Sequence, residues 1–271
     1  MEKQEKRDKK ILEGVTNWWV DIDGTIKCGV DVVPGASDAV NRMRESGDVT
    51  FVTNVTTSSS KGLAEELKSY GIECKPEEVY SATDSVIRWL HKNRPGARVL
   101  AEGTEAFLRQ LHDHGIKLVD EKPDLALLGF NRVGNKLIFG DAYAAIHDGI
   151  DFVVTHDNIN VPISKDKFMA DTGILLPGIK KATGKDPLAI AGKPYSHMYE
   201  GLQDHLNLSG KEKIAMVGDG SSDMQFAHDY GLASVFVKTG GQTEEDMVKK
   251  GIAPHVVLDS IADYDKGDLE R

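Results

Sequence analysis

Short apolar runs alternate along this chain with segments in which apolar and charged residues recur at helical spacing. The apolar runs have the length and the Val, Ile and Leu content of buried strands. Strands that alternate with helices predict a parallel sheet with helices on both faces. The strands that we expect are residues 15–22, 49–53, 79–81, 98–101, 125–130, 152–155, 188–191, 213–217, 233–237 and 256–258.

Glycines and capping residues mark the bounds of the segments between these strands. We expect a short hairpin or flap at residues 26–33 and a polar loop at residues 156–172. The expected helices are residues 36–45, 61–70, 84–93, 104–114, 141–147, 196–206 and 243–249, with further short helices after Gly178 and Ser222.

The order of these elements indicates one sheet interrupted by another. A second series of strands and helices begins at about Ala82, and the first pattern resumes after Pro187. We therefore expect an α/β protein with a Rossmann-like doubly wound parallel sheet core and an inserted α/β domain. The core would comprise residues 11–81 and 188–271, and the insertion residues 82–187. Residues 1–10 are almost wholly polar, which predicts a mobile tail.

The composition of the 271-residue chain, 40% hydrophobic and 28% charged, is that of a soluble globular protein. No apolar run approaches the ~20 residues of a membrane helix. The N-terminus lacks the apolar segment of a signal peptide, so we expect a cytoplasmic protein that does not bind membranes. The two cysteines, Cys28 and Cys74, are then expected to be free thiols.

The net charge of −10 argues against nucleic-acid binding, which needs a basic face. An anionic substrate would need a local positive centre, such as a metal ion plus a lysine.

Two acids, Asp21 and Asp23, lie at the end of the first expected strand. Side chains alternate along a strand, so both carboxylates would point the same way. Gly24 then allows a sharp turn. Neighbouring like charges need compensation, and Mg²⁺ prefers carboxylate and carbonyl oxygens. Taken alone, such a pair is more often a strand that ends in a solvated acidic turn.

Further polar groups follow three other strands, namely Thr53 with Asn54, Lys193, and Asp219 with Asp223. Each group alone could be a cap, a surface lysine or a turn. Ligands of open α/β sheets bind at the carboxyl ends of strands, so together these groups predict a site for phosphoryl transfer.

The chemistry assigns a role to each of these residues. Asp21 would attack phosphorus and form an aspartyl-phosphate, while Asp23 would act as acid and then base. Thr53, Asn54 and Lys193 would bind the phosphoryl oxygens. The metal ligands would be Asp21, the backbone carbonyl of Asp23, Asp219 and, directly or through water, Asp223.

In this order the motifs resemble the haloacid dehalogenase superfamily of phosphatases, over nearly all of residues 15–260. The subclass with a large α/β cap, the nitrophenylphosphatase and NagD-like group (subclass IIA), is most similar. The resemblance rests on Asp21-Ile22-Asp23-Gly24-Thr25, Pro34-Gly35-Ala36, Phe51-Val52-Thr53-Asn54, Gly192-Lys193-Pro194, Val217-Gly218-Asp219 and Thr239-Gly240.

This resemblance implies a Mg²⁺-dependent phosphomonoester hydrolase for small metabolites such as sugar phosphates or glycerol phosphate. The inserted segment would be the cap, which covers the site and selects the substrate, and family members commonly form homodimers through it. The family's second Asn after Thr-Asn is replaced here by Val55, and its T-N-x-D cap loop reads Thr155-His156-Asp157-Asn158. The fourth motif, Gly218 to Asp223, is one residue shorter than usual. His156 and Asn158 are candidate substrate contacts, although structural hydrogen bonding would also explain them.

Two other functions would use the same acids. A phosphotransferase or phosphomutase would protect the aspartyl-phosphate from water and pass it to a sugar. A phosphoacceptor switch would keep it, but such a switch needs neither Asp23 nor a domain-sized insertion.

Overall fold

The structure is a computed structural model that describes residues 10–133, 136, 137, 139–164 and 167–264. The tail predicted at residues 1–10 falls, apart from Lys10, outside the described residues.

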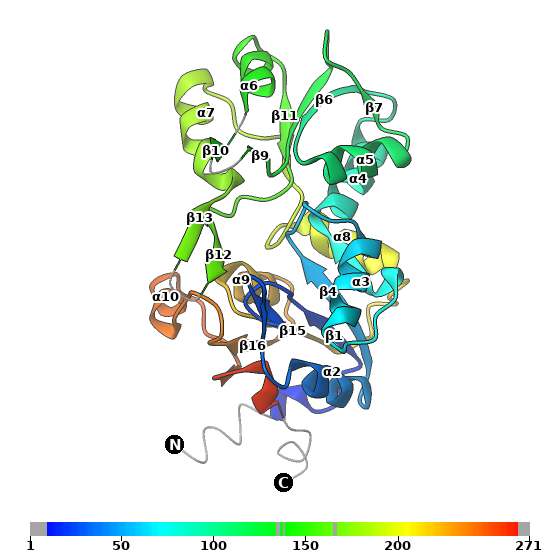
Figure 1. Cartoon of the computed structure of the whole chain (residues 1–271), viewed down its shortest axis with the longest axis vertical. Coiled ribbons are helices and arrows are strands. Elements are labelled where there is room, and N and C mark those ends of the chain that lie inside the picture. Colours follow the sequence, from blue (N-terminus) through cyan, green and yellow to red (C-terminus); the bar gives the residue numbers. More distant parts are fainter. Residues whose placement is uncertain (1–9, 134–135, 138, 165–166, 265–271) are drawn as a thin grey trace.

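Six parallel strands form the larger sheet, in the order β17-β16-β15-β1-β4-β5, in the lower half of Figure 1. The central strand β1 carries adjacent tryptophans that point to opposite faces, and both are fully buried. The strands are β1 (Asn17–Val20), β4 (Asp48–Thr53), β5 (Val79–Ser81), β15 (Ile214–Gly218), β16 (Ala233–Val237) and β17 (Val256–Leu258).

Helices cover both faces of this sheet, as the alternating pattern predicts. Trp18 packs into one core with α2 (Ala36–Arg44) and α3 (Ser60–Ser69). Trp19 packs into the other with α8 (Ser196–His205) and α9 (Ser221–Asp229). Helix α10 (Glu244–Lys249) follows β16, and the 3₁₀ helices η1 (Lys10–Leu12), η2 (Pro76–Glu78) and η4 (Ile261–Asp263) lie in the connecting segments.

A second parallel sheet, of order β14-β11-β8-β6-β7, lies above the first in Figure 1. Helices α4 and α5 cover one face and α6 and α7 the other. Its elements are α4 (Ala82–Asn93), β6 (Arg98–Glu102), α5 (Glu105–Asp113), β7 (Lys117–Leu118), β8 (Leu125–Leu128), α6 (Gly140–His147), β11 (Phe152–Val154), α7 (Leu176–Thr183) and β14 (Ala189–Ile190).

The mixed α/β fold with two parallel sheets confirms the predicted fold class. The domain division stays a prediction, with a core of residues 11–81 and 188–271 and an insertion of residues 82–187. One strand crosses that boundary, because β14 pairs with β11 in the upper sheet rather than with a strand of the lower one.

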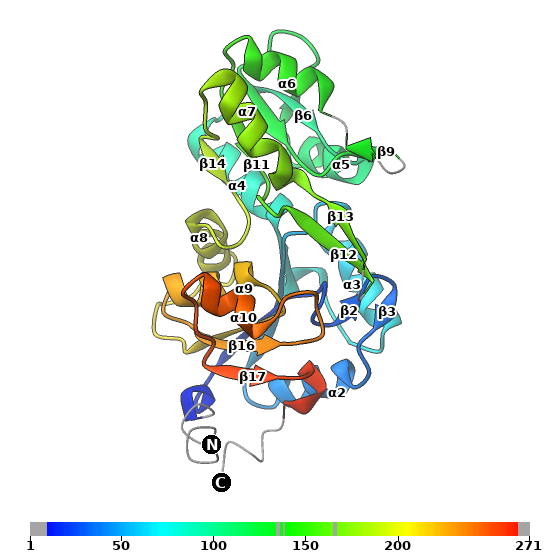
Figure 2. The same cartoon turned by 90° about the vertical axis from the view of Figure 1, so that its left-hand side faces the viewer.

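Within the described residues, three small antiparallel hairpins complete the fold. The predicted flap is the hairpin of β2 (Lys27–Cys28) and β3 (Asp31–Val32). A second pairs β9 (Arg132–Val133) with β10 (Lys136–Leu137). The third, β12 (Asn160–Ser164) with β13 (Lys167–Ala170), reaches down from the upper half to contact β2 (Figure 2).

The prediction of a polar loop over residues 156–172 is therefore wrong. This segment contains the β12–β13 hairpin and ends where the short 3₁₀ helix η3 (Thr172–Leu175) begins. Pro162, which has no N–H to donate, interrupts the strand signal in the sequence.

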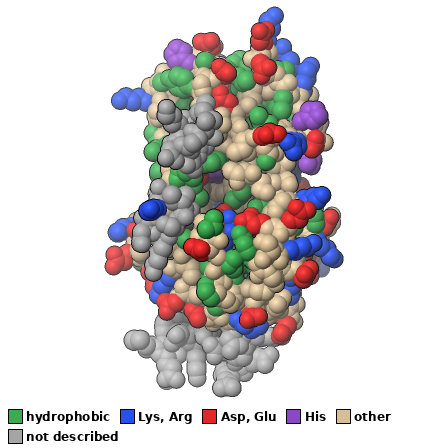
Figure 3. Space-filling model, in the orientation of Figure 1, with side chains coloured by type: hydrophobic (Ala, Val, Ile, Leu, Met, Phe, Trp, Pro, Cys, Tyr) green, Lys and Arg blue, Asp and Glu red, His purple; other side chains and the backbone are tan. Residues whose placement is uncertain are grey.

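Basic and acidic side chains are interspersed over the face drawn in Figure 3. Among the described residues, no helix is both long enough and apolar enough to cross a bilayer. No disulfide joins Cys28, which is half-buried, to the buried Cys74, as predicted.

Candidate active site

The strands β1, β4 and β15 end at one edge of the lower sheet, beneath the upper half of the molecule. Asp21 follows β1, Thr53 is the last residue of β4, and Asp219 follows β15. A cavity of about 440 Å³ opens over this edge. It is lined by every site residue expected from the sequence, namely Asp21, Asp23, Thr53, Asn54, His156, Asn158, Lys193, Asp219 and Asp223.

Lys193 lies at the centre of the floor and is 1% exposed. Its Nζ donates to Asp21 Oδ1 at 2.7 Å, to Asp223 Oδ1 at 2.7 Å and to the Val52 carbonyl at 2.6 Å. An ammonium group has three N–H donors, so this network uses all of them. A phosphoryl oxygen that contacts Lys193 must therefore share or replace one of these partners.

Three buried carboxylates surround this lysine. Ligand atoms of Asp21, Asp219 and Asp223 all lie within 4.8 Å of one another. Burial raises the pKa of Asp21 to about 7, even though the ammonium of Lys193 opposes the shift. Burial, with the charges of Asp21 and Asp223, also raises the pKa of Asp219 well above its usual range. Ionised together, three carboxylates and one ammonium leave two negative charges, which a divalent cation would balance.

Two glycines make room for the Asp219 carboxylate. A Cβ on Gly24 would lie 2.2 Å from Asp219 Cγ, and one on Gly240 would lie 1.6 Å from Asp219 Oδ2. Gly24 also has φ +91°, a backbone conformation that other residues rarely adopt. The neighbouring Thr239 donates its hydroxyl to the Gly24 carbonyl at 2.5 Å. The Gly24 and Thr239–Gly240 motifs thus hold Asp219 between two loops.

Asp223 joins the start of α9 to the site. Its Oδ2 accepts from the Gly220 N–H at 3.1 Å and its Oδ1 accepts from Lys193. Both oxygens keep further lone pairs, which a cation could use.

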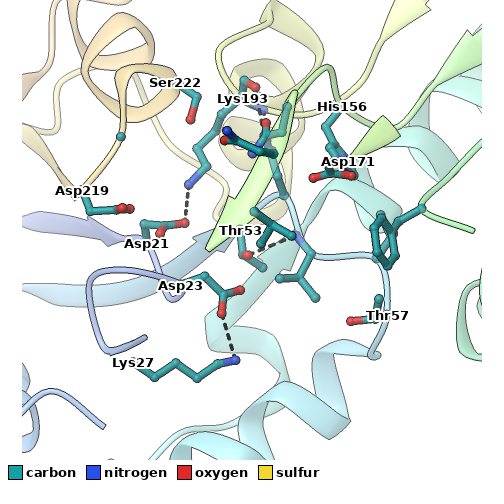
Figure 4. Close-up of a pocket in the computed structure, with 18 of the residues that line it drawn as sticks. Asp21, Asp23, Lys27, Thr53, Thr57, His156, Asp171, Lys193, Asp219 and Ser222 are labelled. Atoms are coloured by element: carbon teal, nitrogen blue, oxygen red, sulfur yellow. Dashed lines mark hydrogen bonds and ion pairs between the residues drawn. The ribbon is translucent and has the colours of Figure 1, made fainter. Parts of the chain in front are cut away.

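Asp23 points away from Lys193, toward the flap (Figure 4). Its Oδ1 pairs with Lys27 Nζ at 2.9 Å, and Lys27 also contacts Glu66 Oε1 at 3.3 Å. Although burial favours a neutral amine, Asp23 and Glu66 raise the pKa of Lys27 to about 12. The charged Lys27 therefore anchors the carboxylate of Asp23 at the cavity wall.

Asn54 forms hydrogen bonds both within the lower half and to the upper half of the molecule. Its Oδ1 accepts from the Lys193 N–H at 2.8 Å, and its Nδ2 donates to the Lys193 carbonyl and to Asn158 Oδ1. The amide is thus committed to protein partners, and phosphate binding at this position would use the backbone. The neighbouring Thr53 hydroxyl accepts from the Val55 N–H at 3.1 Å.

The upper wall of the cavity holds a buried pair, His156 and Asp171, whose Nε2 and Oδ1 lie 2.9 Å apart. Asp171 is at the start of η3, inside the segment expected to be a plain loop. Beside this pair the lining contains the apolar Phe130, Val161 and Met169 and the polar Asn158 and Asn160.

Sequence reasoning missed three charged residues of the cavity, namely Lys27, Glu66 and Asp171. Lys27 follows Asp23 by four residues within the expected flap, which was a usable signal. Glu66 and Asp171 carry no local signal, because only the packing of distant segments brings them to the cavity.

Comparisons with known proteins identify the family of this chain. The profile of the family "Haloacid dehalogenase-like hydrolase" matches residues 18–117, and that of a second, HAD-hydrolase-like family matches residues 190–264. The first match contains Asp21, Asp23 and Thr53, and the second contains Lys193 and Asp219.

Several proteins named as phosphatases are similar over most of the chain. An acid sugar phosphatase of Staphylococcus aureus is 27% identical over 238 residues, which cover 87% of this chain and 91% of the relative. A p-nitrophenyl phosphatase structure from Archaeoglobus fulgidus aligns with a TM-score of 0.81 and 28% identity, covering 92% of this chain and 97% of that one. The structure of a glycerol phosphate phosphatase from Mycobacterium tuberculosis, in complex with magnesium, aligns with a TM-score of 0.79 and 26% identity. That alignment covers 93% of this chain and 76% of the other.

Proposed function

Because this chain belongs to the haloacid dehalogenase-like hydrolases of the nitrophenylphosphatase and NagD-like group and is a phosphatase, we propose that it hydrolyses phosphomonoesters of small metabolites with Mg²⁺. Sugar phosphates and glycerol phosphate are the substrates that we favour. The observation that carries the proposal is the buried group of Asp21, Lys193, Asp219 and Asp223 at the floor of a cavity.

Asp21 is the nucleophile in this proposal. Lys193 Nζ donates to Oδ1 and so holds the carboxylate in place. Attack by a carboxylate oxygen on phosphorus forms a P–O bond to Asp21 and breaks the bond to the alcohol oxygen. The product is an aspartyl-phosphate and the alcohol.

Asp23 transfers the protons. In the first step its carboxylic acid protonates the alcohol oxygen that leaves. In the second step its carboxylate removes a proton from the water that attacks the aspartyl-phosphate. Its position on the cavity wall, separate from the floor occupied by Lys193, suits a group that faces the leaving alcohol and the incoming water.

The transferring phosphoryl group needs donors for its oxygens. The Thr53 hydroxyl accepts from the Val55 N–H but keeps its own proton to donate at the carboxyl end of β4, and Lys193 adds positive charge. Stabilisation of the phosphoryl oxygens is the main catalytic contribution in such reactions.

The residues present fit a magnesium ion. Asp21, Asp219, Asp223 and the Asp23 carbonyl are oxygen ligands of the kind that Mg²⁺ prefers, and two glycines give the Asp219 carboxylate its space. A bound Mg²⁺ would neutralise charge on the phosphoryl oxygens.

The size of the cavity supports a small substrate. Its volume, about 440 Å³, lies within the range of about 300–1,000 Å³ typical of small-molecule sites. At the edge of the cavity, the β12–β13 hairpin contacts the flap strand β2. This contact would limit access for a phosphoprotein.

The proposal is tested by phosphate release from p-nitrophenyl phosphate and a panel of sugar and glycerol phosphates, with Mg²⁺ and with EDTA. We expect metal-dependent turnover that Asp21→Asn lowers at least about a thousandfold. Transfer of phosphate to an added sugar without release would favour a phosphotransferase, and a lasting phosphoprotein without turnover would favour a phosphoacceptor switch. Turnover that persists in EDTA would contradict the proposal.

A further inference from the structure

The carboxylate of Asp171 faces the cavity from the upper wall, next to His156 (Figure 4). Its side chain is 7% exposed, so its charge is largely removed from water. A buried carboxylate is costly unless donors bond to it. The hydrogen-bond partners of its two oxygens therefore show whether the carboxylate still lacks a donor.

One oxygen of Asp171 is fully engaged. Oδ1 accepts from the Thr172 N–H at 2.6 Å, contacts His156 Nε2 at 2.9 Å and accepts from the Thr172 hydroxyl at 3.2 Å. In the part of the chain that the structure describes, no hydrogen bond reaches the other oxygen, Oδ2. Oδ2 is therefore the acceptor atom of the His156–Asp171 pair that a molecule in the cavity could use.

His156 holds Asp171 rather than the substrate. Its Nε2 faces Asp171 and its Nδ1 lies 3.0 Å from the Thr155 hydroxyl, so neither ring nitrogen remains for a ligand. Burial alone would raise the pKa of Asp171, but His156 and the two bonds from Thr172 hold it below its usual range. Asp171 thus stays ionised and fixed in orientation.

We propose that Asp171 Oδ2 accepts a hydrogen bond from a hydroxyl group of the substrate's alcohol portion, which makes Asp171 a specificity-determining residue. This inference rests on the proposed phosphatase function. A hydroxyl suits this oxygen because Oδ1 already meets three partners, and because apolar side chains of Phe130, Val161 and Met169 line the same cavity.

The charges of the cavity indicate that this alcohol carries no anionic group, and the hydroxyl proposed as the donor to Asp171 gives it no cationic one. Among the described lining residues, the two lysines are already paired: Lys27 with Asp23 and Glu66, and Lys193 with Asp21 and Asp223. A carboxylate or second phosphate on the substrate would find no uncommitted cation there and would meet the charge of Asp171. The substrate class is therefore the monophosphate of a neutral polyhydroxy alcohol or sugar.

The test compares three phosphate esters with one another, and glycerol 3-phosphate with two charged esters, 3-phosphoglycerate and phosphoethanolamine. Glycerol 3-phosphate carries hydroxyl groups, propyl phosphate has the same carbon chain without them, and p-nitrophenyl phosphate reports on the chemical step alone. We expect the wild type to prefer glycerol 3-phosphate over propyl phosphate by about tenfold or more in kcat/KM. Asp171→Asn should lose about tenfold on glycerol 3-phosphate, mainly through KM, and little on the other two esters.

Asp157→Asn is the matched control. Asp157 lies in the same upper-half loop but bonds the Tyr195 hydroxyl at 2.5 Å and does not line the cavity. It should keep the preference for glycerol 3-phosphate. Asp171→Ala, checked for folding by its p-nitrophenyl phosphate turnover, should lose the preference as Asp171→Asn does.

Three results would overturn the inference. One is equal loss on all three esters in Asp171→Asn, which would assign Asp171 a structural role alone. Another is a wild type that does not distinguish glycerol 3-phosphate from propyl phosphate. The third is a preference for 3-phosphoglycerate or phosphoethanolamine over glycerol 3-phosphate. Failure of the phosphatase proposal itself would look different, because the wild type would then release no phosphate even from p-nitrophenyl phosphate.

Discussion

At the scale of single residues, the Asp219 carboxylate can occupy its position because two neighbouring residues, Gly24 and Gly240, have no side chain. Gly24 and Gly240 approach it so closely that a Cβ on either would overlap the carboxylate. In the sequence these glycines look like ordinary turn residues. In the structure they are part of the candidate metal site, because they decide where one ligand lies.

Gly240→Ala tests this dependence. The added methyl group would lie 1.6 Å from Asp219 Oδ2, so the carboxylate must move. We expect Mg²⁺ affinity to fall about 10- to 100-fold, as is typical when the support of a metal ligand is lost. The Mg²⁺ dependence of p-nitrophenyl phosphate turnover measures this change.

Gly178→Ala provides the control, because a Cβ there meets nothing within 4 Å and Gly178 lies in α7, far from Asp219 in sequence. Unchanged Mg²⁺ affinity in Gly240→Ala would show that Asp219 does not hold the ion.

The candidate residues differ in how far the sequence predicts them. Asp21, Thr53 and Asp219 come directly from the strand pattern, because parallel strands present their carboxyl ends at one edge. The sequence does not predict that the Asn54 amide is committed to Lys193 and Asn158, nor that Asp171 faces the cavity. Those contacts depend on how the upper half packs over the lower sheet.

At the scale of elements, the flap β2–β3 contributes to the site through Lys27. This residue lies between Asp23 and Glu66 of α3, and it connects the candidate acid/base residue to a core helix. Without the ammonium group, two carboxylates would face each other and Asp23 would move.

We therefore expect Lys27→Met to impair proton transfer selectively. The kcat for glycerol 3-phosphate should fall about tenfold or more, because an alkoxide leaving group needs a proton. The first turnover of p-nitrophenyl phosphate should keep its rate within about threefold, since its phenolate leaves without a proton, whereas later turnovers also need Asp23 to activate water. The control is Lys61→Met, which removes an exposed lysine whose Nζ lies 4.0 Å from Glu65 Oε1. It should change neither value. A first turnover of p-nitrophenyl phosphate slowed as much as that of glycerol 3-phosphate would mean that Lys27 acts on something other than Asp23.

Element positions followed from the sequence wherever hydrophobic periodicity was strong. All strands of the larger sheet and the helices on its two faces lie close to the predicted residues. The hairpin β12–β13 was missed because Pro162 masks its pattern. The strand that β14 pairs with was also not predicted, because the sequence of a two-residue strand does not indicate which sheet the strand joins.

At the scale of the whole molecule, the structure concentrates uncompensated negative charge at the floor of the cavity. Asp21, Asp219 and Asp223 are all at most 9% exposed, with Lys193 as their shared counter-charge. In the metal-free protein, burial raises the pKa of Asp21 to about 7. Folding stability from this group is therefore present below its ordinary pKa of about 3.9 and is lost as the pH rises through about 7.

Magnesium should restore that lost stability, because it binds the ionised carboxylates and competes with protons. At about 100 times its Kd, Mg²⁺ should raise Tm by about 5–10 °C near pH 8, and by much less near pH 5. Thermal unfolding with Mg²⁺ and with EDTA measures the difference. Asp219→Asn should abolish it, and a Tm increase that is independent of pH would contradict this account of the charges.

The central claim, that Asp21 carries the phosphoryl group and Asp23 releases it, is tested most directly by trapping the intermediate. Asp23→Asn is incubated with Mg²⁺ and p-nitrophenyl phosphate, whose leaving group needs no acid, and is then quenched in acid for peptide mass spectrometry. The account predicts a phosphoryl group on Asp21, and none when Asp21→Asn is added to the same chain. No phosphorylation of Asp23→Asn while the wild type turns over, or phosphorylation at another residue, would contradict it.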